Sequence, residues 1–244
     1  MTGIENGPHA SIDEIADGIH RISISFPPSV FPGGFSFNQY LIADDKPLLY
    51  HTGLRRLFPQ VRDAIERVLP VSTLAYIGFS HVEADECGAL NKFLAAAPRA
   101  VPVCSQVAAM TSIGDLADRP PQAMADGEVL VLGRHRVRWF DTPHTPHGWE
   151  CATAFEETTR TLLCGDLFTQ PGCDHPPLTD GDILGPSEAF RAEMDYYAHG
   201  PDSRRHLVRL SETRPAILAC MHGSAWRGDG GALLLALADR VAPA

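Results

Sequence analysis

One short segment of the chain concentrates residues that can hold metal ions. Residues 80–88 contain one imidazole and three carboxylates, those of His81, Glu83, Asp85 and Glu86. The segment directly follows the apolar run 73–79, which has the composition of a buried strand. A strand that ends in such a cluster fixes where the ligands begin, and the following turn spreads them around one point. His81 and Glu83 are two residues apart and can point to one ion. Asp85 and Glu86 lie at the start of a helix and can point to a second ion.

Further candidate ligands lie downstream, where other apolar segments end. These candidates are His144, His147, Asp166 and His222. Strand ends of open α/β sheets meet in a crevice at the sheet edge, so we expect these side chains to converge on the first segment. Imidazole suits iron, zinc and copper, whereas carboxylates suit harder ions. The pattern therefore predicts a site for two metal ions.

The charge of the candidate ligands supports two divalent ions. Glu83, Asp85, Glu86 and Asp166 carry four negative charges, which two divalent cations balance. A neutral ligand set is tolerable in a water-poor crevice, whereas bare charge is not. Oxygen-rich coordination favours iron or manganese over zinc. We expect iron, with zinc or manganese as the alternatives.

The hydrophobic pattern predicts the elements that position these ligands. Strands are expected at 19–25, 36–43, 47–51, 73–79, 100–104 and 215–220, and hairpins at 128–141 and 151–164. Helices are expected at 56–69, 88–97, 105–111, 187–199, 202–212 and 231–241. This order predicts an αββα sandwich, in which two mixed β-sheets pack face to face with helices outside. Residues 19–244 then form a single domain, preceded by a flexible N-terminal stretch, 1–18.

Composition excludes several functional classes. The net charge is −10 and no Lys/Arg run occurs, which disfavours a nucleic-acid or anionic-membrane partner. No apolar stretch approaches the length of a membrane span, and the N-terminus lacks the features of a signal peptide. The six cysteines form no CxxC pair, so we expect reduced thiols in a cytoplasmic protein.

The motifs and their order resemble the metallo-β-lactamase superfamily. That family uses His-x-His-x-Asp-His, a His within Thr-Pro-Gly-His-Thr-Pro-Gly, a strand-end Asp and a late His. The matching segments of this chain are 81–86, 142–148, 164–166 and 221–223. Glutamate at the second motif position, Glu83, is similar to the flavodiiron proteins and their flavin-free, oxygen-binding di-iron relatives. The opening hairpin also resembles the family, although His51 stands where the family usually has Asp.

The resemblance implies a ligand set. It assigns the first metal to His81, Glu83 and His144, the second to Asp85 and His222, and the bridging position to Asp166. His147 is then expected beside the metal or facing the substrate, and as the alternative to His144 it can itself be the ligand. Glu86 stands where the family has His, so it either ligates the second metal or swings away and leaves an open position.

Three functions are consistent with this pattern. The first is a di-iron protein that binds or reduces a diatomic gas such as O2 or NO. We recognise no FMN site or flavodoxin domain in the sequence, so we expect this function to need an external electron donor, such as a redox partner protein.

The second function is a zinc- or manganese-dependent hydrolase of an ester, thioester, lactone or phosphodiester. A metal-bridging water would be its nucleophile, and His147 or Glu86 could shuttle the proton. The third is a non-catalytic sensor or scaffold stabilised by metal. We expect loops 26–35 and 168–186 to set the choice of small molecule, and base rates for soluble enzymes favour a homodimer.

Overall fold

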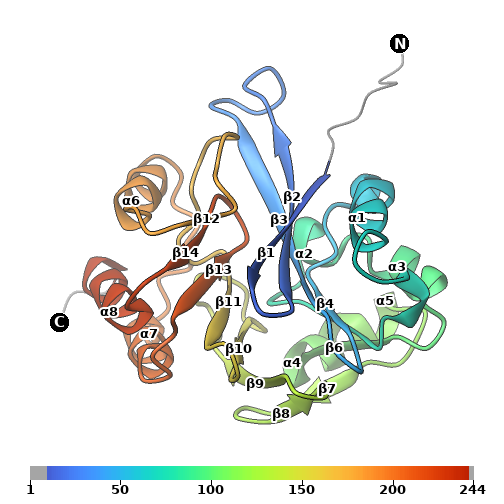
Figure 1. Ribbon diagram of the computed structural model, residues 1–244. Coiled ribbons are helices and arrows are strands. Elements are labelled where there is room, and N and C mark those ends of the chain that lie inside the picture. Colours follow the sequence, from blue (N-terminus) through green and yellow to red (C-terminus); the bar gives the residue numbers. More distant parts are fainter. Residues whose placement is uncertain (1–9, 242–244) are drawn as a thin grey trace.

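Two seven-stranded β-sheets pack face to face, with helices on both outer faces (Figure 1). The computed structural model describes residues 10–241. The first sheet runs in chain order: β1 (Ala10–Ala16), β2 (Ile19–Phe26), β3 (Phe35–Ile42), β4 (Leu48–Tyr50), β5 (Tyr76–Gly78), β6 (Val101–Ser105) and β7 (Gln122–Met124). Its strands are antiparallel from β1 to β4 and parallel from β4 to β7. This mixed sheet confirms half of the predicted sandwich.

The second sheet has the order β12-β14-β13-β11-β10-β9-β8. Its strands are β8 (Val129–Val131), β9 (Arg136–Asp141), β10 (Ala152–Glu156), β11 (Thr161–Gly165), β12 (Leu178–Thr179), β13 (Ile217–Cys220) and β14 (Ala225–Arg227). Strands β11 and β13 are parallel neighbours, so their carboxyl ends reach the same edge. The same sheet edge therefore receives the residues that follow both strands, Asp166 and His222.

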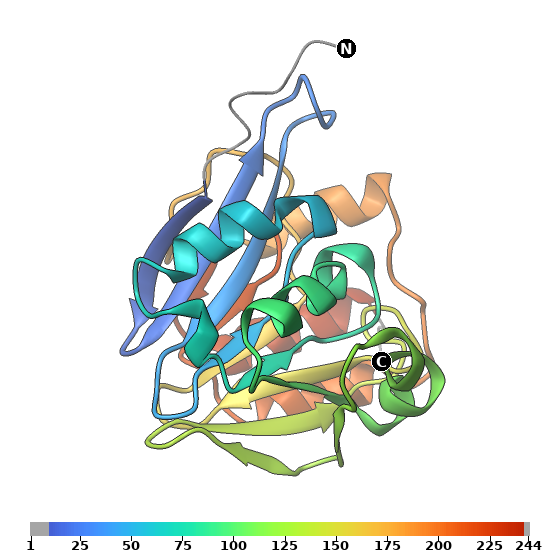
Figure 2. The same ribbon diagram turned by 90° about the vertical axis from the view of Figure 1, so that its right-hand side faces the viewer.

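Helices cover the outer face of each sheet (Figure 1). The helices are α1 (Phe58–Ile65), α2 (Ala84–Cys87), α3 (Leu90–Ala96), α4 (Gln106–Ala108), α5 (Gly114–Leu116), α6 (Leu184–Glu193), α7 (Ser203–Ser211) and α8 (Gly230–Val241). Short 3-10 turns occur at Arg55–Leu57 and Val71–Thr73, and a π-helical turn at Ala109–Ile113. Figure 2 shows α1 lying across the blue strands of the first sheet. Within residues 10–241, no helix has the length and hydropathy that a membrane span requires.

The hydrophobic core has three layers, as two stacked sheets with outer helices require. Between the sheets, Tyr40 and Tyr50 pack with Trp139 and Leu163. A second cluster joins the first sheet to α1 and α3, and a third joins the second sheet to α7 and α8. The central strands pack through apolar side chains on both of their faces. This packing holds the strand ends, and therefore the candidate ligands that follow them, in fixed positions.

Several predicted boundaries need correction. Residues 10–16, expected within a flexible stretch, form strand β1 and pair antiparallel with β2. This strand is polar because it lies at the sheet edge with most side chains partly exposed, and the hydrophobic pattern therefore missed it. Residues 1–9 lie outside the described part of the chain. The helix expected at 187–199 ends at Glu193, and the short strands β7, β12 and β14 were not predicted.

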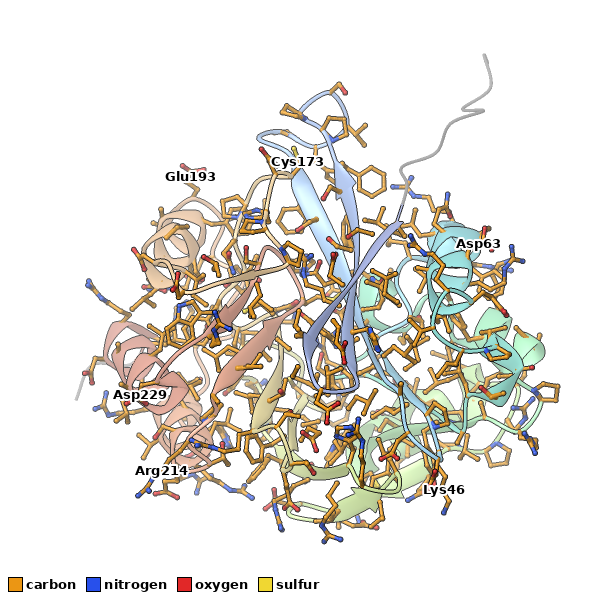
Figure 3. All side chains as sticks on the ribbon, viewed as in Figure 1. Lys46, Asp63, Cys173, Glu193, Arg214 and Asp229 are labelled. Carbon is orange, nitrogen blue, oxygen red and sulfur yellow. The ribbon has the colours of Figure 1, made fainter. Side chains whose placement is uncertain are left out.

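The two loops expected to set the choice of small molecule contact each other. The β2–β3 connection, 27–34, meets residues 171–173 of the long loop after β11. Gly172 N–H donates to Gly34 O, and the Cys173 side chain lies against Gly34. Cys173 is labelled near the top of Figure 3, beside this connection. The contact ties the two loops together at one end of the sandwich.

Candidate metal centre

The candidate ligands converge at the ends of strands from both sheets. His81 and Glu83 follow β5 in the first sheet, and Asp166 and His222 follow β11 and β13 in the second. His147 lies in the connection between β9 and β10. Glu83 occupies the N-cap position of α2, but its side chain makes no capping hydrogen bond. Its carboxylate instead faces the imidazoles.

Four side chains form the first group: His81, Glu83, His147 and Asp166. His81 Nε2 lies 2.9 Å from His147 Nε2, and each of these nitrogens lies 3.1 Å from Glu83 Oε2. Asp166 Oδ2 lies 3.5 Å from His81 Nε2 and 3.3 Å from His147 Nε2. Two imidazole nitrogens and two carboxylate oxygens that share one centre are a ligand set for iron, zinc or manganese.

Asp85, Glu86 and His222 form the second group. His222 Nε2 lies 3.5 Å from Asp85 Oδ2 and 3.3 Å from Asp166 Oδ1. Asp166 thus directs Oδ2 at the first group and Oδ1 at the second. This is the geometry that a carboxylate bridging two ions requires.

Each of the three imidazoles is held through its other ring nitrogen. His147 Nδ1 donates to the carbonyl of Tyr196 at 2.8 Å, and His222 Nδ1 donates to the carbonyl of Ser36 at 2.8 Å. Because a carbonyl only accepts, the neutral ring carries its proton on Nδ1 and leaves Nε2 free to ligate. His81 Nδ1 lies 2.9 Å from the Ser80 hydroxyl. All three rings are therefore oriented with Nε2 toward the centre.

Glu86 is fully buried, and its surroundings fit a cation. Neither carboxyl oxygen has a hydrogen-bond partner of ordinary geometry among the described residues. Burial, together with the charge of Asp166, raises the pKa of Glu86 well above its ordinary value. An ionised carboxylate in this position is costly unless a positive charge compensates it. A divalent ion between Glu86, Asp85 and His222 would supply that charge.

Without metal, the carboxylates of the cluster favour protonated imidazoles beside them. Burial opposes charge on His81, but the nearby carboxylates, Glu86 first and then Glu83 and Asp166, together raise this pKa well above its ordinary value. Burial likewise opposes charge on His147 and His222, yet hydrogen bonds to Glu83 and Asp166 raise both pKa values. Hydrogen bonds from His147 and then from His81 lower the pKa of Glu83 to about 2. Binding of a cation would release these protons.

The structure corrects the expected position of His144. His144 is exposed and adopts a left-handed conformation with φ 61°, and its N–H donates to Gly148 O. This turn directs its Cβ toward Gly200, so the side chain belongs to neither group of ligands. His147, three residues later, takes the place expected of His144. The role expected of His147 as a proton shuttle conflicts with this placement, because its Nε2 lies within the first group.

Several residues that support the site carry no sequence motif. Glu150 is buried, and its Oε1 accepts the N–H of Val82 at 2.9 Å, which holds the turn between His81 and Glu83. Phe35 packs on the ring of His222, with centroids 4.4 Å apart. In the sequence, Phe35 was singled out only as part of loop 26–35, which was expected to set the choice of small molecule.

The fold, with two adjacent groups of side chains that could each hold a metal ion, defines a metallo-β-lactamase-like domain. The protein-family model described as ODP family beta lactamase matches residues 35–188, more than half of the 244 residues. The chain therefore belongs to this family. The predicted fold and the resemblance to flavodiiron cores are confirmed by this match and by the structural neighbours.

Known relatives are flavodiiron proteins. The chain is 25% identical over 231 residues to rubredoxin-oxygen oxidoreductase of Megalodesulfovibrio gigas, covering 88% of this chain and 57% of the relative. It is 25% identical over 206 residues to anaerobic nitric oxide reductase flavorubredoxin of Pectobacterium atrosepticum, covering 80% of this chain and 40% of the relative. The chain thus spans well under two thirds of the length of either relative.

A solved structure shares the fold over nearly the whole chain. The metal-soaked Flv1 flavodiiron core of Synechocystis sp. PCC6803 superposes with a TM-score of 0.78 at 21% identity. The match covers 96% of this chain and 61% of that chain. At this level of identity the likeness establishes the fold, and the chemistry has to be argued from the residues described above.

Proposed function

We propose that this chain holds two iron ions and binds or reduces a diatomic gas, O2 or NO, with electrons from an external donor. The observation that carries the proposal is the position of Asp166, which offers one carboxylate oxygen to each of two groups of ligands. The names of the relatives, an oxygen oxidoreductase and a nitric oxide reductase, support the choice of gas. An iron pair supplies the capacity to exchange electrons with such a gas.

The two ligand sets differ in chemistry. The first ion would take His81, Glu83, His147 and Asp166, whereas the second would take Asp85, Glu86, His222 and Asp166. The second set has three carboxylates and one imidazole, which suits a harder ion than the first set. Because zinc prefers nitrogen and sulfur ligands, this oxygen-rich set favours iron or manganese.

The site can be reached from one face of the molecule. The Glu83 side chain is 53% exposed and lines a surface cavity of about 610 Å³ together with Cys87 and Leu116. A neighbouring cavity of about 490 Å³ is lined by Asp85 and Phe31. Arg55 and Ala84 line both cavities, so Glu83 of the first group and Asp85 of the second open toward the same side. We propose that the gas enters here.

The hydrolase alternative loses its expected proton shuttles. His147 has its Nε2 within the first group, and Glu86 lies buried in the second, so neither is free beside a bridging water. A hydrolase would retain zinc or manganese and cleave an ester or lactone without an electron donor. These properties separate the two functions experimentally.

Metal analysis followed by gas challenge tests the proposal. Protein purified without added metal, and protein reconstituted anaerobically with ferrous iron, should each contain two irons per chain. Exposure to air should then produce a new visible absorption band and consume O2. The matched pair His147→Ala and His144→Ala serves as the control, because only the first should lose metal. Two zinc ions per chain, no spectral change and turnover of an ester would refute the proposal.

A further inference from the structure

His51 and Ser80 form a buried hydrogen-bonded chain that ends on the ligand His81. The Ser80 hydroxyl lies 2.9 Å from His81 Nδ1 and 3.1 Å from His51 Nε2. Each of these three side chains is at most a few per cent exposed. We infer that His51 is a positioning residue that, through the Ser80 hydroxyl, sets which nitrogen of His81 faces the first metal. The inference rests on the proposed function and deepens it.

One backbone N–H group determines which atoms donate and which accept along the hydrogen bonds from His51 to His81. Ser80 N–H points at His51 Nε2, at an N···N distance of 3.4 Å, and an amide N–H can only donate. His51 Nε2 is therefore the unprotonated nitrogen of a neutral ring. Burial lowers the pKa of His51 to about 3, which agrees with a neutral ring. The Ser80 hydroxyl can then donate to the same nitrogen.

A hydroxyl that donates to His51 has only its lone pairs left for His81. His81 Nδ1 must then carry the proton and donate, which leaves His81 Nε2 unprotonated. That nitrogen is the atom 2.9 Å from His147 Nε2 and 3.1 Å from Glu83 Oε2.

The tautomer of His81 depends on His51 and Ser80, whereas the tautomers of the other two histidine ligands are set by carbonyl groups. His147 and His222 donate Nδ1–H to carbonyl groups, which can only accept. A serine hydroxyl can donate or accept, so alone it would permit either tautomer of His81. His51 removes that freedom. Loss of a group that hydrogen-bonds to a metal-binding histidine and orients it typically lowers metal affinity about 10–100-fold.

The backbone around the chain is built to hold it. His51 adopts φ 65°, and its N–H donates to Gly78 O of the neighbouring strand. Ser80 O accepts the N–H of Ala152 from the second sheet. Both sheets therefore fix the two groups that orient His81. A residue at position 51 must tolerate the left-handed conformation, which Asn does better than most residues.

Four variants test the inference through zinc affinity, measured by competition with a chelator. Ser80→Ala and His51→Leu should each weaken the first zinc about 10–100-fold. His51→Asn keeps an acceptor at this position and should bind zinc with close to wild-type affinity. The double variant Ser80→Ala/His51→Leu should bind no more weakly than Ser80→Ala, because His51 acts through the hydroxyl.

A control separates orientation from loss of stability. His135 is also fully buried, but it precedes β9 at the strand end opposite the site and pairs with Glu156 at 3.0 Å. His135→Leu should lower the melting temperature and leave zinc affinity unchanged. In zinc-loaded protein, ¹⁵N chemical shifts should show His81 protonated at Nδ1 and zinc-bound at Nε2.

Two results would overturn the inference: wild-type zinc affinity in His51→Leu, or losses in the double variant that add. Zinc binding does not require reaction with a gas, so failure of the proposed redox function leaves this test intact. If wild-type protein binds no metal, the proposed function fails, and ¹⁵N shifts at a pH where His81 is neutral still decide. The Nε2–H tautomer there would contradict the role of His51.

Discussion

Replacement of Glu86 by glutamine removes one negative charge from the ligands and preserves the shape of the side chain. In metal-free protein burial, together with the charge of Asp166, raises the pKa of Glu86 well above its ordinary value, so the site favours the uncharged form that glutamine resembles. Neither oxygen of the Glu86 carboxyl group has a hydrogen-bond partner of ordinary geometry within residues 10–241 that the substitution could break. The free energy of unfolding of the metal-free protein should therefore change by less than about 1 kcal/mol.

The metal-bound protein should respond very differently. Glu83, Asp85, Glu86 and Asp166 together balance two divalent ions, and Glu86→Gln leaves one positive charge without a partner in a buried site. Loss of one partner of a buried ion pair typically costs about 3–5 kcal/mol. At 1.4 kcal/mol per factor of ten, the second ion should bind roughly two to four orders of magnitude more weakly. The first ion, with His81 and His147, should be affected much less.

Stepwise titration calorimetry with ferrous or manganous ions can measure both affinities. Chemical denaturation in chelator measures the stability of the metal-free protein. The expected result is loss of one high-affinity ion per chain with little change in metal-free stability. Retention of two ions at wild-type affinity would refute the assignment of Glu86 as a ligand. A large loss of metal-free stability would refute the reasoning that the buried site favours the uncharged form of Glu86.

Three further predictions follow from the same geometry. His147→Ala should release the first ion, whereas His144→Ala should retain both, as counted by metal analysis after desalting; equal loss in the two variants would contradict the assignment. Metal-free protein should lose stability as pH rises above 6.5, because the raised pKa values of the buried histidines mean that the fold retains protons which the unfolded chain releases. Each such histidine contributes about 1.4 kcal/mol per pH unit until its folded pKa is passed. Glu83, with its pKa lowered to about 2, acts oppositely: its contribution is present above 4.5 and is lost as pH falls toward 2. Denaturation curves across pH check both signs, and a stability that rises above pH 6.5 would contradict the first. Gly165→Ala should weaken the first ion in a chelator competition, because a Cβ there would lie 3.0 Å from Ser80 Oγ in a left-handed backbone, φ 54°; unchanged affinity would show that Ser80 has room to move.

Local patterns in the sequence located most of the site. His81, Glu83, Asp85 and Glu86 lie within six residues after a buried strand, so chain geometry alone brings them together. Asp166 and His222 follow parallel neighbouring strands, and the order of strands in an open sheet places such ends together. The positions of these ligands depend on where a strand lies and where it ends, and both can be read from the hydrophobic pattern of the sequence.

Other features depend on contacts between distant parts of the chain. His144 and His147 are three residues apart in one loop, and the carbonyl of Tyr196, 49 residues away, fixes His147 in the site. The distinction could not be read from the loop itself. His51 reaches Ser80 across 29 residues, between the ends of strands β4 and β5, which lie side by side in the first sheet. Strand β1 was missed because an edge strand with partly exposed side chains lacks a strong hydrophobic pattern.

Anomalous diffraction at the iron edge, from crystals of anaerobically reconstituted protein, tests the central claim most directly. The claim predicts two iron peaks, with one oxygen of Asp166 directed at each. His81 and His147 should contact one ion, and Glu86 and His222 the other. A single peak, no peak, or an ion bound through His144 in place of His147 would contradict it.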